Sequence, residues 1–121
     1  MGPLNEIRFK IIKKAFVHLD AENTGAIDFE YIKSQFIAHN HPDVLSGKKG
    51  EEEVYKEFIS TFDTHRYLYG TDSDPNVGYN EWIEYYHNIN ANIDGDENFI
   101  SIINNVWNLD GKAFKYKTAK V

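Results

Sequence analysis

Apolar residues recur at three- and four-residue spacing along the first part of the chain. The row consists of Phe9, Ile12, Phe16 and Leu19, and lysines fill positions between them. Because an α-helix turns once every 3.6 residues, this spacing brings the apolar side chains to one face and the lysines to the other. The pattern predicts an amphipathic helix over about residues 5–19.

The same spacing predicts four further helices. Their apolar positions, in chain order, are Ile32, Phe36 and Ile37; Val54, Phe58, Ile59 and Phe62; Trp82, Ile83 and Tyr86; and Phe99, Ile103 and Val106. Residues 51–53 are glutamates, which are favourable at the positive N-terminal end of a helix dipole and mark the start of the third helix. Residues 38–50 contain a proline and two glycines, so we expect a linker there within one domain. Asp94 or Asp96 would cap the fifth helix.

The first four helices form two similar helix–loop–helix units. In each unit an aromatic residue lies shortly before an aspartate, and one aliphatic residue, Ile27 or Val77, lies in the middle of the loop. These two aliphatic residues are suited to a short strand pairing between the loops. The sequence therefore predicts an all-α fold of paired EF-hands, with a short two-stranded pairing of the loops and an extra C-terminal helix.

We expect a single EF-hand lobe over residues 1–109, followed by a basic tail over residues 110–121. The expected segments of the lobe are hand one at about 6–39, a linker at 40–50, hand two at about 51–90 and the extra helix at about 94–107. The tail contains four lysines and has no clear hydrophobic period.

Charge and composition narrow the functional classes. The chain has 13 basic and 19 acidic side chains and a formal net charge of −6, which argues against a nucleic-acid partner and suits a protein that collects cations. It has no cysteine, so disulfides and thiolate metal sites are excluded and we expect a cytoplasmic location. We find no nucleophile with a base at plausible spacing and no glycine loop that could cradle a phosphate, so we expect no enzymatic activity.

The first loop matches most of a calcium-binding loop. Such a loop places oxygens at positions 1, 3, 5, 7 and 9, a glycine at position 6 and a bidentate glutamate at position 12, because Ca²⁺ takes six to eight oxygen ligands. The candidate ligands are Asp20, Glu22, Thr24, the Ala26 carbonyl and Asp28. Gly25 takes position 6, but Tyr31 takes position 12, and its phenol cannot replace the carboxylate. Either the loop is a weak site completed by water or Asp28, or it only joins two helices.

The second loop has the closing glutamate but an irregular beginning. Glu81 precedes the exiting helix as position 12 would. Counting back, the candidate ligands at positions 3, 5, 7 and 12 are Asp72, Asp74, Asn76 and Glu81. In this register Pro75 stands where the glycine belongs, and Gly70 leaves position 1 without a ligand.

A second alignment of this loop starts at Asp63. Asp63 is then the first ligand, and residues 64–70 are an insertion that bulges outward. Asn76 would make the turn that Pro75 forbids, because proline fixes φ near −65°. Carboxylates crowded together repel one another without a cation, so we expect a calcium site here; a solvated polar loop without an ion is the alternative. Because Glu81 directly precedes Trp82, it can close the cage and anchor the exiting helix, so we expect this loop to be the stronger calcium site.

Two longer segments are more specific than a generic EF-hand. They are HPDVLSGKKGEEEVYKEFISTFD (His41–Asp63) and GYNEWIEYYHNINANIDGDENFISIINNVWNL (Gly78–Leu109). Their H-P-x-V linker and their terminal helix ending at Trp107 resemble the calcyphosin family of EF-hand proteins. Calcyphosins have four hands, so the resemblance implies the C-terminal half of a cytosolic calcium-binding protein, often of motile cilia, without enzymatic activity. Tyr31 and the lengthened second loop depart from the family pattern.

We therefore expect a calcium-responsive sensor or regulator with Ca²⁺ as its cofactor. Without the ion, Asp72, Asp74 and Glu81 would repel one another; with it, Glu81 would be drawn in and the exiting helix would expose aromatic surface. The expected partner is a cytoskeletal or ciliary protein, and we expect no nucleic acid, no membrane span and a monomer when isolated. The expected location is the cytoplasm, at the cilium or cell cortex. The alternative is a calcium-independent structural adaptor whose degenerate EF-hands dock on such a partner.

Overall fold

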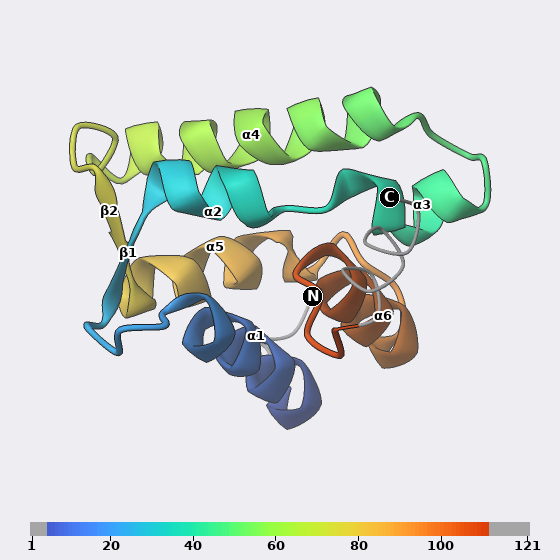
Figure 1. Ribbon diagram of the computed structural model, residues 1–121, viewed down its shortest axis with the longest axis horizontal. Helices are drawn as coiled ribbons and strands as arrows, with labels where there is room; N and C mark the ends of the chain where they lie inside the picture. The colour runs from blue at the N-terminus through green and yellow to red at the C-terminus, as the bar shows by residue number, and fades with distance from the viewer. Residues whose placement is uncertain (1–4, 112–121) are drawn as a thin grey trace.

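Helices and two short strands make up most of the described chain, residues 5–111, in a computed structural model (Figure 1). In chain order the elements are α1 (Glu6–Leu19), β1 (Ala26–Asp28), α2 (Phe29–Gln35), the 3-10 turn η1 (Ala38–Asn40), α3 (Pro42–Leu45), α4 (Glu51–Leu68), β2 (Asn76–Gly78), α5 (Tyr79–Asn90) and α6 (Asp96–Val106). Most of the predicted basic tail, residues 112–121, lies outside the described residues. No helix within residues 5–111 combines the length and the apolar character that a membrane crossing requires.

The two loops meet through the strands at one end of the molecule, on the left in Figure 1. β1 and β2 run antiparallel, and Ile27 lies opposite Val77. Both side chains are buried, which holds the register because a shift by one residue would turn them toward solvent. The predicted pairing of these two residues is confirmed. The fold is that of paired EF-hands with an additional C-terminal helix, α6.

Aromatic side chains from both hands form one core. The rings of Trp82 and Trp107 lie 5.3 Å apart and are fully buried. Trp82 Nε1 donates to the Ile12 carbonyl at 3.0 Å, and Trp107 Nε1 donates to Tyr86 Oη at 2.8 Å. A buried indole N–H needs an acceptor, so these two bonds fix the orientation of the rings. The core therefore joins α1, α5 and the end of α6.

The second helix is shorter than predicted. α2 ends at Gln35, and Phe36 has an extended backbone with φ −72° and ψ 120°. Its ring stacks on Phe58 of α4 with centroids 4.1 Å apart, and the next residue, Ile37, donates its N–H to the Val106 carbonyl at 2.8 Å. Tertiary packing has overridden the helical spacing, so the prediction that Phe36 and Ile37 continue the helix is wrong.

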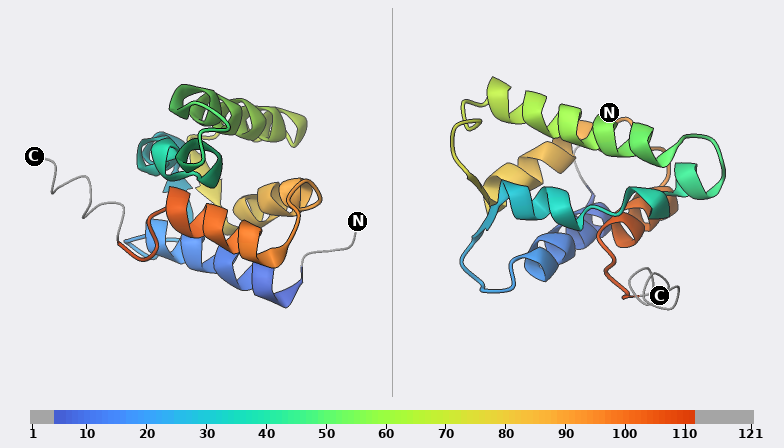
Figure 2. Two further views of the ribbon diagram at one scale, coloured as in Figure 1. Left: turned by 90° about the vertical axis from the view of Figure 1, so that its right-hand side faces the viewer. Right: turned by 45° about the horizontal axis from the view of Figure 1, so that its top comes forward.

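α6 packs beside α1, as both views in Figure 2 show. Arg8 of α1 connects them: its Nε donates to Asp96 Oδ1 at 2.8 Å, and its Nη1 donates to the Asn90 side-chain oxygen at 2.7 Å. Its guanidinium also lies 4.7 Å from the centroid of the Phe99 ring. The N-cap of α6 is Gly95, which has no side-chain cap, so the prediction that Asp94 or Asp96 caps this helix is wrong. Asp96 instead binds α1 to α6.

Candidate metal centre

The first loop folds around the carboxylate of Asp20. This residue ends α1, and its side chain accepts hydrogen bonds from the backbone N–H groups of Thr24 at 3.1 Å and Gly25 at 2.8 Å. The N–H of Gly25, followed by the contacts with Thr24, holds the pKa of Asp20 below its usual value despite an opposing desolvation effect. Gly25 has φ +86°, a backbone conformation that favours glycine. The sharp turn predicted at position 6 is therefore present.

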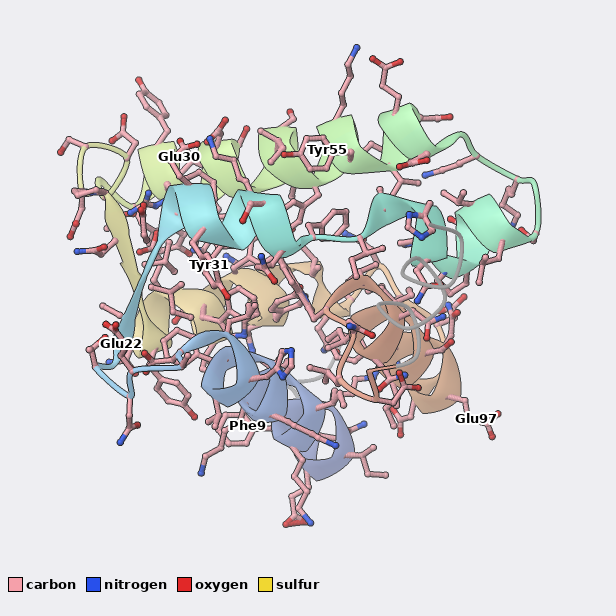
Figure 3. The ribbon with its side chains drawn as sticks, in the orientation of Figure 1. Phe9, Glu22, Glu30, Tyr31, Tyr55 and Glu97 are labelled. Carbon is pink, nitrogen blue, oxygen red and sulfur yellow. The ribbon has the colours of Figure 1, made fainter. Side chains whose placement is uncertain are left out.

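The predicted loop-one ligands line one cavity of about 330 Å³. Its walls are Leu19, Asp20, Ala21, Glu22, Thr24, Ala26, Ile27, Asp28 and Tyr31. Figure 3 labels Glu22 on this loop and Tyr31 on α2. The structure thus brings all five predicted residues of loop one together, with the tyrosine of position 12 at the same cavity.

The loop-one oxygens suit a hard cation. They include three carboxylates, and within residues 5–111 no ion pair involves Asp20, Glu22 or Asp28. Two of the other oxygens bond each other, because Thr24 Oγ1 donates to the Ala26 carbonyl at 2.8 Å. In the described part of the chain, no three acidic or histidine side chains converge closely enough to hold a metal by themselves. The residues fit Ca²⁺ in type and order, and they require some inward movement to hold it.

The position-12 side chain is the weak point of loop one. Tyr31 is 44% exposed, and a phenol offers one neutral oxygen where a glutamate would offer two charged ones. Asp28 also has a second task, since its Oδ1 accepts the Glu30 N–H at 3.1 Å and caps α2.

The second loop begins later than the Asp63 alignment predicted. α4 continues to Leu68, so Asp63 is an exposed residue in the middle of a helix and residues 64–68 do not bulge outward. That alignment of the loop is wrong. The helix ends at Leu68 with Tyr69 as its C-cap, and Gly70 follows with φ +74°, which places the start of the loop at the position given by counting back from Glu81.

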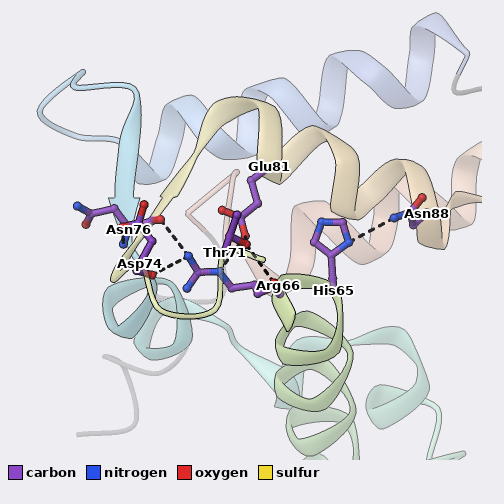
Figure 4. Close-up of polar contacts among 7 residues, drawn as sticks. All are labelled: His65, Arg66, Thr71, Asp74, Asn76, Glu81 and Asn88. Atoms are coloured by element: carbon purple, nitrogen blue, oxygen red, sulfur yellow. Dashed lines mark hydrogen bonds and ion pairs between the residues drawn. The ribbon is translucent and has the colours of Figure 1, made fainter. Parts of the chain in front are cut away.

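The side chain of Arg66, near the end of α4, points into loop two (Figure 4). Arg66 Nε donates to Glu81 Oε2 at 2.8 Å, and Arg66 Nη2 donates to the carbonyls of Asp74 at 2.7 Å and Asn76 at 3.0 Å. Thr71 Oγ1 also donates to Glu81 Oε2, at 2.8 Å. The side chains of the ion pair are only 3% exposed for Arg66 and 12% for Glu81. Two predicted ligands, the Asn76 carbonyl and the Glu81 carboxylate, are thus bound to a guanidinium.

The rest of loop two differs from a calcium loop. Asn76 lies in β2 and, among the described residues, is not one of the non-glycine residues with positive φ, so the prediction that it makes the turn in place of Pro75 is wrong. Asp74 Oδ1 accepts the N–H of Asn76 at 2.9 Å, and Asp72 is exposed. The structure therefore gathers Asp74, Asn76 and Glu81 around Arg66 and leaves Asp63 outside.

Sequence reasoning missed Arg66, although its spacing carried a signal. Val54, Phe58 and Phe62 mark the buried face of α4, and Arg66 is the next residue at the same four-residue interval. A basic residue on a buried helix face needs an anionic or carbonyl partner, because an unpaired buried charge is costly.

The fold and the two loops define a paired EF-hand lobe with two dissimilar loops. No protein-family model matches the chain. The chain is similar to crustacean calcium-binding protein 23 of Faxonius limosus, with 36% identity over 104 residues, which cover 86% of the chain and 49% of that protein. It is also similar to crustacean calcium-binding protein 23 of Homarus americanus, with 32% identity over 75 residues, covering 62% of the chain and 48% of that protein. The chain spans about half the length of these curated relatives. The calcyphosin resemblance stays a prediction.

Proposed function

We propose that this chain is a calcium-binding EF-hand lobe and that loop one is its ion site. The observation that carries the proposal is the cavity of about 330 Å³ lined by Asp20, Glu22, Thr24, Ala26 and Asp28. These residues follow the alternating order of a calcium loop. The names of the two crustacean relatives, both calcium-binding proteins, give independent support.

The chemistry of these oxygens favours Ca²⁺ over other divalent ions. Carboxylate, hydroxyl and carbonyl oxygens are hard ligands, whereas zinc and copper favour nitrogen and sulfur. Mg²⁺ demands near-ideal octahedral geometry, which a loop with flexible acidic side chains supplies poorly. Since Tyr31 removes one charged bidentate ligand, we expect a dissociation constant weaker than about 10⁻⁵ M, the weak end of the range for calcium sensors.

The bound ion would supply positive charge at the centre of loop one, and the residues of the chain would carry its effect outward. Asp28 would turn toward the cavity and weaken its cap on α2. The Ala26 carbonyl would exchange its hydrogen bond from the Thr24 hydroxyl for a contact with the ion. Ala26 and Asp28 both adjoin Ile27, which pairs with Val77 of hand two. We propose that this movement of α2 and β1 gives the lobe a regulatory role. A cytoplasmic setting and a ciliary or cytoskeletal protein partner are proposals that rest on the calcyphosin resemblance.

A structural adaptor is the second candidate function. It is favoured by Arg66, which already neutralises Glu81 in loop two, and by Tyr31 at position 12 of loop one. In that case both hands would hold their arrangement without calcium, and the aromatic helices would dock on a partner at any calcium concentration.

Calorimetric calcium titration separates the two functions. We expect the wild-type protein to bind one ion per chain, and Asp20→Asn to weaken binding at least about tenfold, because affinity follows the number of charged ligands. The matched control is Asp94→Asn, which removes the same charge from an exposed residue between α5 and α6 and should leave binding unchanged. Equal binding by Asp20→Asn and wild type would contradict the site, and absence of binding in wild type would favour the adaptor.

A further inference from the structure

We propose that Arg66 is a tethered cation that takes the place of calcium in loop two. Hand two would then hold its arrangement permanently, without an ion, and the lobe would respond to calcium through hand one alone. The role of Arg66 stands on its own contacts, whereas the response through hand one rests on the proposed function of loop one.

Arg66 contacts the groups that would hold an ion in a calcium loop. In a calcium loop the ion is held by the backbone carbonyl of position 7 and the carboxylate of position 12, which here are the Asn76 carbonyl and Glu81. Both accept hydrogen bonds from the guanidinium of Arg66, at 3.0 and 2.8 Å, and the carbonyl of Asp74 accepts a third at 2.7 Å. An arginine suits this place because its planar fork carries several donors in fixed directions. It thus connects the start of the loop, the strand and the exiting helix.

The remaining residues of loop two do not fit calcium. Gly70 offers no side-chain ligand at position 1, and Pro75 lacks the positive φ of the usual glycine. The side chain of Asp74 bonds the backbone of Asn76. A divalent ion beside the guanidinium would also meet a like charge at short range, which is strongly unfavourable in a buried place.

The side chain of Arg66 is buried between the two hands. Arg66 is 3% exposed, and its guanidinium lies 5.1 Å from the centroid of the Phe29 ring at the start of α2. It therefore reaches from α4 of hand two to both α5 and hand one. Arg66 also holds β2 through its hydrogen bond to the Asn76 carbonyl. In β2, Val77 pairs with Ile27 of loop one. Loop one would bind its ion against a partner strand that is already in place.

Thermal unfolding in the presence of a calcium chelator tests the assignment. The variants are Glu81→Gln, Arg66→Met and the double variant. Each single variant leaves a buried group without its partner, so we expect each to lower Tm by about 10 °C or more. The double variant should lose less than the sum of the two. The matched control is Glu84→Gln, an exposed residue one turn further along α5, which should shift Tm by no more than about 4 °C.

A calcium titration of Glu81→Gln completes the test. We expect the variant to bind the same number of ions per chain as wild type, whether that number is one or none. Loss of one calcium equivalent in Glu81→Gln, together with a wild-type Tm in chelator, would overturn the proposal. If Arg66→Met does not fold, Arg66→Lys replaces it, and its lysine should retain part of the stability because it keeps the charge but not the fork. A failure of loop one to bind calcium would appear in the wild-type titration and would leave the chelator experiment intact.

Discussion

Arg66 and Glu81 form a largely buried ion pair across the two ends of loop two, with Arg66 Nε 2.8 Å from Glu81 Oε2. In a calcium-binding EF-hand this glutamate would close the cage around the ion. Here it is held by a side chain of the helix that enters the loop, and Thr71 supplies a second donor to the same oxygen. Removing one partner of such a pair costs about 3–5 kcal/mol, because the other charge is left buried and unpaired. The two hands of this lobe therefore differ in how their loops are held.

The hydroxyl of Thr71 should stabilise Glu81 to a measurable extent. Thr71→Val keeps the shape of the side chain but removes the 2.8 Å hydrogen bond to Glu81 Oε2. We expect a loss of about 1.5–3 kcal/mol in the free energy of unfolding, the usual range for a hydrogen bond to a charged group. Urea unfolding with chelator present measures it. The control Thr64→Val alters an exposed threonine of α4 and should change the stability by less than about 0.5 kcal/mol; equal effects of the two variants would contradict the role of Thr71.

Restoring the missing acid of loop one should tighten calcium binding. Tyr31→Glu places a carboxylate at position 12, and Tyr31 already lines the cavity with the other ligands. We expect affinity to rise at least about tenfold in calorimetry, because the number of charged ligands tunes affinity. Tyr67→Glu adds the same charge to an exposed tyrosine of α4 and is the control. Unchanged affinity in Tyr31→Glu would remove loop one as the ion site.

The stability of the lobe should fall in mild acid through His65. Burial lowers the pKa of His65, although Glu81 and Glu84 oppose the shift. Between the folded-state pKa and the unfolded value of about 6.5, the unfolded chain binds more protons, so stability rises with pH there and is lost as pH falls below about 6.5. His41 contributes in the same direction, because burial also lowers its pKa.

Denaturant unfolding at several pH values checks this dependence. His65→Gln should reduce the loss of stability between pH 6.5 and lower values, whereas His18→Gln, at an exposed position, should leave the pH profile as in wild type. The same pH profile for His65→Gln and wild type would show that His65 does not contribute.

The sequence predicted the parts of this structure that depend on local pattern. The spacing of Ile12, Phe16 and Leu19 predicted α1 and its buried face, although Phe9, expected on the same face, is 38% exposed. The aliphatic residues Ile27 and Val77 predicted the strand pairing, because both are buried. The five ligand positions of loop one were also found together, since consecutive residues of a tight loop cannot move far apart.

The sequence failed where contacts between distant residues decide. Phe36 leaves the helical path to stack on Phe58, and no local pattern shows the position of that ring. α4 runs through Asp63 to Leu68, and Arg66 on this extension contacts Glu81 and two carbonyls of the next segment. Counting acids in loop two therefore suggested a stronger calcium site, whereas Glu81, the acid at position 12, pairs with a cation on the preceding helix.

The central claim is that calcium enters loop one while Arg66 keeps its place in loop two. Nuclear magnetic resonance of the ¹⁵N-labelled protein during a calcium titration tests both halves at once. We predict that the amide of Gly25 shifts with calcium and saturates, and that the Nε–H resonance of Arg66 persists in chelator and hardly moves as calcium is added. A large shift or loss of the Arg66 resonance together with an unmoved Gly25 amide would contradict the account.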